Sequence, residues 1–288
     1  LSEARKIEDW QKVQNWRVRD PFTHITDSKL LVGFDELLTR LYHFAAIGKN
    51  YAVIYGHYGY GKTIVLKKLS HEFSKKYNVV LFENPVTKDE LKSRLKPLYS
   101  SRVLSLLGLQ RIGNEDFHAI NNAMKKRTVL IFDEAHSLDK DVFSYVRSLS
   151  EAGTSFTIIF AGKPELFKAK EAEQRLPQYI IDRLDVSEAI RPLNFDESLE
   201  LIKRRVEQVA LSKDYLFDDD AILYIADKSK YIPRGVLENC SKFVELAIQK
   251  NIHKVDYKTV EKYFSSVVKE AAAEPVIEYS VARETAPK

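Results

Sequence analysis

Cysteine, glycine and proline are all scarce in this chain of 288 residues. The single cysteine, Cys240, excludes an internal disulfide and a multi-cysteine metal site, and it favours a reducing, cytoplasmic compartment. With only 10 glycines and 9 prolines, long flexible linkers are not expected. The seven histidines are scattered and show no metal-ligand spacing.

Long apolar runs are also missing. The longest span only a few residues, such as 129–132, whereas a membrane helix needs roughly 20, so we expect no bilayer span and no membrane partner. The first thirty residues carry acids and lack an apolar stretch, so we expect no secretory signal in them. The 45 basic and 41 acidic residues give a net charge of only +4, so any basic surface that binds nucleic acid must be a local patch.

Short apolar runs alternate with helical stretches between about residues 50 and 195. The runs at 51–55, 79–82, 129–132 and 156–160 predict strands buried on both faces of a parallel sheet. A helical stripe follows the first run at Ile64, Val65, Leu69 and Phe73, and another precedes it between Phe34 and Phe44. The pattern is typical of an α/β fold, with the 34–44 helix packed at the edge of the core.

Strand signals stop after about residue 195, and amphipathic helices are predicted over 196–213, 219–228, 233–250 and 256–272, with Asp219 and Asp256 as N-caps. We therefore expect an N-terminal arm (1–32), an α/β core (33–194), a small all-helical lid domain (195–272) and a disordered tail (273–288). Trp10, Trp16 and Phe22 suggest that the arm docks on this chain or on a neighbour.

The segment between the first predicted strand and the next helix matches the pattern G-x-x-x-x-G-K-[ST]. Glycines let successive N–H groups turn inward around phosphate oxygens, and the helix N-terminus adds partial positive charge. Lys62 would reach the β- and γ-phosphates of ATP, and the Thr63 hydroxyl would bind Mg²⁺. The residues expected to bind the nucleotide here are Gly56, His57, Tyr58, Gly59, Tyr60, Gly61, Lys62, Thr63 and Ile64.

The 129–132 run ends in two carboxylates, Asp133 and Glu134. Because open α/β sheets bind ligands at the carboxyl ends of their strands, both acids should lie beside the phosphate loop. Asp133 would hold Mg²⁺, and Glu134 would orient a water for attack on the γ-phosphate. His136 is interpreted as a structural neighbour rather than a catalyst.

In this order, the loop at 56–63, the acidic strand at 129–134 and the helices after 195 resemble an AAA+ ATPase. Segments 31–37, 160–166, 181–184 and 191–193 are similar to the branch that contains transposition ATPases (MuB, TniB and TnsC types), ExeA-like ATPases and origin-recognition ATPases. The resemblance implies a P-loop NTPase core with a helical lid, the cofactors ATP and Mg²⁺, and a homo-oligomer that forms a ring or filament.

The resemblance also implies roles for single residues. Asn84 would restrain the catalytic glutamate, with a turn cap before Pro85 as the alternative. Arg183 would be the arginine finger that reaches a neighbouring subunit, with Arg175 as its competitor. Arg234 would contact the nucleotide from the lid. The fourth strand ends in Ala161 and Gly162 where the family has a polar sensor, so either Lys163, the nearest polar residue, substitutes for it or the sensor is missing.

Residues 88–111 carry six cations against two acids, and this branch often presents DNA contacts after the second strand. Mobile basic side chains could track the phosphates of double-stranded DNA without reading bases. A solvated helix face is the alternative, both here and for the smaller cluster at 203–205. The candidate DNA contacts are Lys88, Lys92, Arg94, Lys96 and Arg102.

These features predict a cytoplasmic, oligomeric, Mg²⁺-dependent ATP hydrolase that acts on DNA as a transposition or replication accessory, with a transposase or replication protein as partner. The alternative is a nucleotide-gated switch for protein interaction, of the signalling or secretion type, with little turnover.

Overall fold

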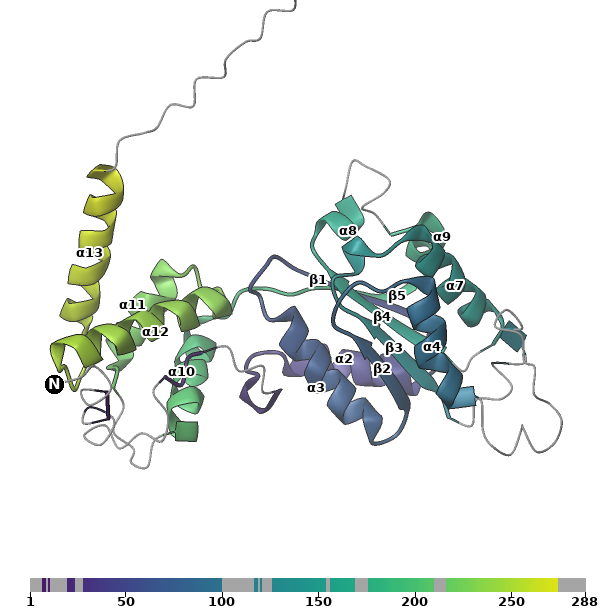
Figure 1. The fold of residues 1–288 in the computed structure, drawn as a ribbon, viewed down its shortest axis with the longest axis horizontal. Helices are drawn as coiled ribbons and strands as arrows, with labels where there is room; N and C mark the ends of the chain where they lie inside the picture. The colour runs from purple at the N-terminus through teal and green to yellow at the C-terminus, as the bar shows by residue number, and fades with distance from the viewer. Residues whose placement is uncertain are drawn as a thin grey trace, which may run out of the picture.

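In the computed structural model, the described residues are 7, 8, 10, 20–23, 28–99, 117, 118, 120, 126–153, 156–168, 176–209 and 216–273. Within them, five strands form one parallel sheet in the order β2-β3-β4-β1-β5 (Figure 1). The strands are β1 (Tyr51–Tyr55), β2 (Asn78–Phe82), β3 (Thr128–Phe132), β4 (Phe156–Gly162) and β5 (Leu184–Ala189). The first four confirm the predicted runs, whereas β5 was not predicted as a strand and is a correction.

The central strands are buried on both faces because alternate side chains pack into two separate hydrophobic cores. Ala52 and Ile54 of β1 pack on one side with Val129 and Ile131 of β3. Tyr51 and Val53, together with Leu130 and Phe132, pack on the other. Aromatic rings from neighbouring strands stack across this second face, with centroids 4.9 Å apart for Phe82 and Phe132 and 5.4 Å apart for Phe132 and Phe160.

Helices cover both faces of the sheet (Figure 1). The predicted stripe between Phe34 and Phe44 is buried and packs against the β5 edge, as expected. On the first face lie α2 (Asp35–Ala46) and α3 (Lys62–Ser74), and on the second α4 (Lys88–Tyr99) and α7 (Lys140–Glu151). Short helical turns fill the connections: η1 (Ser28–Leu30), η2 (Ala135–Ser137), α8 (Glu165–Lys168) and α9 (Gln178–Ile181).

Four helices follow the sheet: α10 (Phe195–Val209), α11 (Asp219–Lys228), α12 (Pro233–Lys250) and α13 (Tyr257–Ala273). The predictions over 219–228 and 233–250 match α11 and α12. Asp256 accepts a hydrogen bond from the Thr259 N–H at 2.9 Å, which confirms that cap, whereas Asp218 and not Asp219 occupies the cap position of α11. Among the described helices, none is long and apolar enough to cross a bilayer. Of the predicted tail, 273–288, only Ala273 is described, and it is the last residue of α13. Residues 274–288 and the end of the first predicted helix, 210–213, lie outside the described residues.

The described part of the N-terminal arm docks on these helices of the same chain. The Trp10 indole N–H donates to the Ile252 carbonyl at 2.9 Å, and the Phe22 ring meets Phe217 edge-on at 5.7 Å. Arg205 donates to the carbonyl of Thr23 at 3.2 Å. Trp16 lies outside the described residues, so its predicted docking has no structural counterpart here.

Candidate nucleotide-binding site

The phosphate loop connects the carboxyl end of β1 to the first residue of α3. Gly59 and Gly61 have φ values of 82° and 96°, in the left-handed region that glycine enters without steric cost. Gly61 is the N-cap of α3, so the helix N-terminus and its unpaired N–H groups lie at the end of the loop. This geometry suits an anion such as phosphate.

Lys62 lies inside the curve of this loop and is only 6% exposed. Its ammonium group donates to the carbonyls of Gly56 at 2.8 Å and His57 at 3.1 Å. Burial lowers the pKa of Lys62, while the charges of Glu134 and Asp133 act in the opposite direction. A buried cation is therefore fixed beside the N-terminus of α3, where two sources of positive potential add.

Thr63 and Asp133 come from the two sequence motifs and meet directly. The Thr63 hydroxyl donates to Asp133 Oδ2 at 2.6 Å, and the Glu134 N–H donates to Asp133 Oδ1 at 2.9 Å. Burial raises the pKa of Asp133, and the Thr63 hydrogen bond partly offsets that rise. A backbone hydrogen bond also holds Asp133 in place, because its N–H donates to the Phe82 carbonyl of β2 at 2.8 Å.

This pair of oxygens fits a magnesium ion. Hydroxyl and carboxylate are the hard donors that Mg²⁺ prefers, and it usually takes one or two protein ligands and completes its shell with phosphate and water. Among the described residues no group of three or more His, Cys, Asp and Glu side chains could form an all-protein metal cage. Thr63 and Asp133 would therefore hold the ion together with the nucleotide.

Glu134 has a left-handed backbone, with φ 48° and ψ 37°, which is uncommon outside glycine and is found at functional sites. Its carboxylate is 38% exposed, lines the cleft and lies 3.3 Å from His136 Nε2. Burial lowers the pKa of His136. His136 thus contacts the predicted base, as a structural neighbour of Glu134 would.

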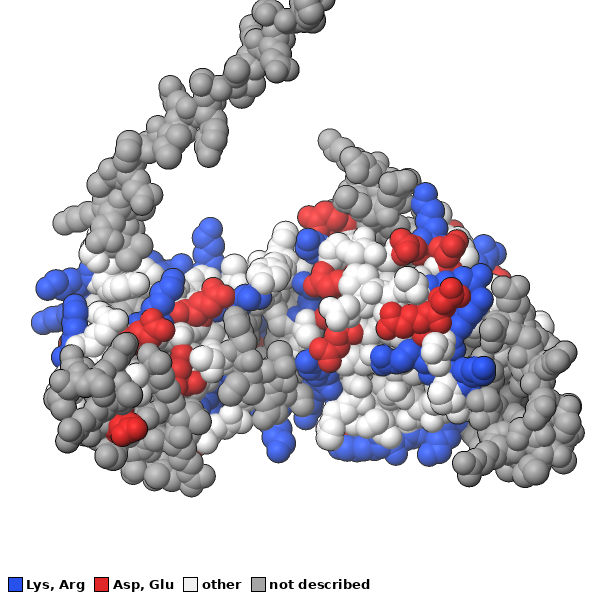
Figure 2. Space-filling view, in the orientation of Figure 1, with Lys and Arg blue, Asp and Glu red and all other residues white. Residues whose placement is uncertain are grey.

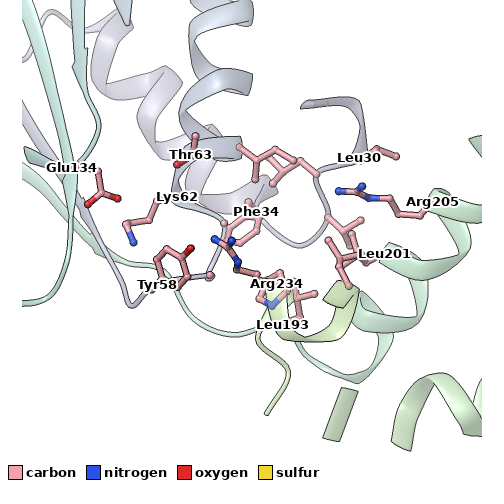
Figure 3. A pocket seen from close by; sticks show the side chains of 17 residues that line it. Leu30, Phe34, Tyr58, Lys62, Thr63, Glu134, Leu193, Leu201, Arg205 and Arg234 are labelled. Carbon is pink, nitrogen blue, oxygen red and sulfur yellow. The ribbon is translucent and has the colours of Figure 1, made fainter. Parts of the chain in front are cut away.

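A cleft of about 330 Å³ opens beside the loop and extends to the helical region, α10 to α13 (Figure 3). Figure 3 shows Lys62, Thr63 and Glu134 on one side and Leu30, Leu201 and Arg205 on the other. The polar end suits phosphates and the apolar end suits a nucleobase. Sequence reasoning did not assign the apolar lining: Leu30, Leu31, Val32, Phe34, Leu193, Leu201 and Leu237.

Arg205 was also not assigned to this site. Its side chain lines the apolar end of the cleft and is only 4% exposed. The only sequence signal was its place in the 203–205 cluster, whose other members are also engaged within the chain. Lys203 pairs with Asp219 at 2.9 Å, and Arg204 donates to the Leu31 carbonyl at 3.0 Å. The cluster is therefore a set of internal contacts.

Arg234 brings the helical region onto the phosphate loop. Its N–H donates to the Gly59 carbonyl at 3.3 Å, and its guanidinium carbon lies 4.4 Å from the centroid of the exposed Tyr58 ring. Its Nε also donates to Glu238 at 2.9 Å. The predicted lid residue and the predicted loop residue thus stack on each other at the cleft.

The other predicted site residues divide between the two edges of the sheet. Asn84 is exposed two residues after β2, and Lys163 directly follows β4, both at the carboxyl edge. The charge of Lys163 helps to lower the pKa of both Lys62 and His136, so it lies close to the site. Arg175 lies outside the described residues.

Arg183 lies at the opposite, amino edge. It directly precedes β5, whose first residue pairs with Tyr51 at the start of β1, whereas the phosphate loop follows the end of β1. Its Nη1 donates to Glu151 Oε1 at 2.7 Å, and the side chain is 48% exposed. The structure therefore does not bring Arg183 to the loop of its own chain.

Most of the described basic side chains on α4 pack against aromatic rings of the same chain. Lys88 and Lys92 lie 5.9 and 5.6 Å from the Tyr145 ring centroid. Arg94 lies 5.0 Å from the Phe82 ring and donates to the Leu81 carbonyl at 3.1 Å, which caps the edge of β2. Lys96 is exposed, and Arg102 lies outside the described residues.

Comparison with known proteins adds a family match. Residues 46–169 match the family described as an AAA domain. A curated relative from Methanocaldococcus jannaschii, the uncharacterized HTH-type transcriptional regulator MJ0774, is 28% identical over 168 residues. That alignment covers 55% of this chain and 40% of the relative, so the chain spans less than half of the relative's length.

Solved structures share the fold at low sequence identity. The Aeropyrum pernix ORC1 protein in complex with DNA has a TM-score of 0.57 and 15% identity, over 91% of this chain and 73% of that one. The Thermotoga maritima RuvB Holliday junction branch migration motor has a TM-score of 0.50 and 17% identity, over 82% and 70%. The fold is thus that of a P-loop NTPase of the AAA+ type: a parallel α/β core followed by a small helical region.

Proposed function

We propose that this protein is an Mg²⁺-dependent ATP hydrolase of the AAA+ type. The observation that carries the proposal is the contact between Thr63 and Asp133 at 2.6 Å, beside a buried Lys62 at a helix N-terminus. A hydroxyl, a carboxylate and an ammonium group in that arrangement serve phosphoryl transfer, and the adjoining cleft has an apolar end for a base.

Each group has a distinct task in this proposal. The loop amides and Lys62 bind and orient the phosphates, and Arg234 contacts the nucleotide from the helical region. Glu134 accepts a proton from the attacking water, and Asn84 restrains Glu134. Mg²⁺ held by Thr63 and Asp133 would supply neutralising charge at the phosphate oxygens.

The proposal includes an oligomer. Arg183 lies at the edge of the sheet away from its own phosphate loop, so it could complete a site only in a second copy of the chain. A guanidinium group stabilises the charge that develops on the transferred phosphoryl group. We therefore propose a ring or filament in which each Arg183 serves its neighbour.

The biological role that we propose is a DNA accessory ATPase of transposition or replication, in a cytoplasmic setting, with a transposase or replication protein as partner. Similarity of fold to an ORC1 protein solved with DNA and to a branch migration motor supports a DNA-related activity. The α4 residues Lys88, Lys92, Arg94 and Lys96, with Arg102 beyond them, are the predicted contacts to duplex phosphates.

A nucleotide-gated switch with little turnover is the second candidate, and one contact favours it. The Arg234 guanidinium is engaged by Tyr58 and Glu238, so a nucleotide that recruits Arg234 must rearrange this stack. Binding alone would then move the helical region relative to the loop, without hydrolysis.

Replacing Glu134 with glutamine tests the hydrolase. Glu134→Gln keeps the side-chain size but removes the base, so we expect ATP affinity within about threefold of the parent and hydrolysis slower by about 10²-fold or more. Phosphate release and binding of a fluorescent ATP analogue measure the two effects. Glu165→Gln, which changes another acid beside the site, is the matched control.

Two results would contradict the hydrolase. Turnover of Glu134→Gln at the parent rate would show that Glu134 is not the base. A parent protein that binds ATP with Mg²⁺ but does not turn over at any protein concentration, with or without duplex DNA, would favour the switch.

A further inference from the structure

The amino edge of the sheet, opposite the nucleotide cleft, carries a row of cations. Lys49 precedes β1, Lys75 and Lys76 precede β2, and Lys126 and Arg127 precede β3. Because the strands are parallel, all three segments end at the same edge. We call these five residues the basic edge.

Backbone and side-chain bonds hold the three segments together. The Asn78 N–H donates to the Arg127 carbonyl at 3.0 Å, which links the β2 and β3 segments. Arg127 donates to the Thr157 hydroxyl at 3.2 Å, and that hydroxyl donates to the Lys49 carbonyl at 2.9 Å. The basic edge is therefore one continuous surface on a rigid sheet.

Acids neutralise only part of it. Lys49 pairs with Asp185 at 2.7 Å, and Lys75 pairs with Glu72, which also lies near Lys68. Among the described residues, acids pair with two of these five cations, which leaves three positive charges in excess. Lys49, Lys75, Lys76 and Lys126 are exposed. Figure 2 shows Lys and Arg as a band along the lower margin of the core, where α3 ends in Figure 1.

We infer that the basic edge binds the sugar-phosphate backbone of duplex DNA. From β2 to β1 the edge crosses three strand spacings, roughly 14 Å, which suits several successive phosphates of a duplex. Flexible lysines contact phosphates without reading bases. The inference rests on the DNA role proposed above and places its main contact on a different surface.

A duplex fits this surface better than a single strand. Single-strand binding relies on exposed aromatic rings on which bases stack. Among the described residues, the exposed large hydrophobic side chains are Ile47, Tyr58, Phe195 and Tyr257, and only Ile47 lies near the basic edge. Because the cleft is at the opposite edge of the sheet, DNA and nucleotide could be bound together.

Charge reversal tests the inference in the full chain. The edge triple variant combines Lys75→Glu, Lys76→Glu and Lys126→Glu. The control triple variant combines Lys242→Glu, Lys258→Glu and Lys262→Glu, which are exposed on α12 and α13 and change the net charge equally. The probe is a fluorescent duplex of arbitrary sequence, titrated at several salt concentrations, with ATP-analogue binding as the measure of an intact fold.

We expect the edge triple variant to weaken duplex binding at least about tenfold near 0.1 M salt. The slope of log affinity against log salt should become shallower by about 0.9 for each lost contact. The control triple variant should stay within about threefold, and both should bind nucleotide like the parent. If the glutamate variant fails to bind nucleotide, Lys75→Gln, Lys76→Gln and Lys126→Gln together should give a smaller effect in the same direction.

Three results would overturn the inference. Equal losses in the two triple variants would show that the basic edge is not the contact, although the DNA role would survive. No duplex binding by the parent at any salt would remove the inference and the DNA role together, but not the hydrolase. The parent could instead bind vesicles of phosphatidylcholine and phosphatidylserine. If the edge triple variant lost that vesicle binding but kept duplex binding unchanged, the surface would be assigned to a membrane.

Discussion

At the scale of single residues, Gly59 lies directly against the helical region, because the Arg234 N–H donates to its carbonyl at 3.3 Å. It has φ 82°, and a Cβ added there would lie 3.0 Å from the Arg234 Cβ and 3.2 Å from Ile232 Cγ2. A side chain would therefore meet both an unfavourable backbone and a close neighbour.

Gly59→Ala should weaken nucleotide binding by about tenfold and destabilise the fold by about 1–2 kcal/mol. Nucleotide titration and thermal unfolding measure these effects. Gly235→Ala is the control, because its added Cβ would meet ordinary contacts, 3.4 Å from Ser229 Cβ, and alanine favours the first turns of α12. Similar losses in both variants would contradict the steric argument.

The residues of the two sequence motifs could be placed from sequence because spacing along the chain defines them. A loop between a strand and a helix, and acids at a strand end, must meet at the carboxyl edge of a parallel sheet. Arg205 and the stack of Arg234 on Tyr58 depend instead on how the helical region packs, and no local pattern encodes that packing. His136 followed the acids in sequence, but its contact with Glu134, whose backbone is left-handed, could not be predicted from that order.

At the scale of elements, α13 begins with a side-chain cap. Asp256 accepts hydrogen bonds from the N–H and the hydroxyl of Thr259, at 2.9 and 2.6 Å, and these bonds lower the pKa of its carboxyl. Removing the acceptor leaves an N–H of the first turn without its partner.

Asp256→Ala should lower the free energy of unfolding by about 1 kcal/mol. Asp139→Ala is the matched control, because Asp139 occupies the cap position of α7 without a side-chain cap bond, so its loss should be smaller. Denaturant titration compares the two, and a larger loss for Asp139→Ala would argue against the cap.

Element type was predictable wherever one pattern persisted. The strands β1, β3 and β4 are largely apolar and buried on both faces, and α11 and α12 carry a clear stripe of buried apolar residues. β5 was missed because its residues alternate between half-buried and exposed and include Asp185 and Glu188. An edge strand of that kind lacks the continuous apolar run of a central strand, and it becomes a strand here by pairing with β1 and contacting α2.

At the scale of the whole molecule, two arginines bond to one acid, but only Arg183 has a proposed role between subunits. Arg147 and Arg183 both donate to Glu151 Oε1, at 2.8 and 2.7 Å. Arg147 lies within α7, and Arg183 directly precedes β5. Arg147 is therefore a matched control for Arg183, because both donate to the same carboxylate.

For the parent protein, the ATPase rate per subunit should rise with protein concentration. Arg183→Ala should abolish that rise and slow hydrolysis by up to about 10³-fold. Arg147→Ala should keep the rise with protein concentration and hydrolyse ATP at the parent rate. Mixing Arg183→Ala with Lys62→Ala subunits should restore activity, because each supplies the group that the other lacks. Equal rates for the two arginine variants, or no recovery on mixing, would contradict a finger shared between subunits.

The contact between Trp10 and Ile252 provides an intrinsic fluorescent probe of the N-terminal arm. The sequence holds two tryptophans, Trp10 and Trp16, and both belong to the N-terminal arm. Trp10 is 1% exposed against the helical region, whereas the sheet and its covering helices contain tyrosine and phenylalanine instead. Selectively excited tryptophan emission therefore comes from the arm alone, and any spectral shift on adding ATP would follow the arm without an attached dye.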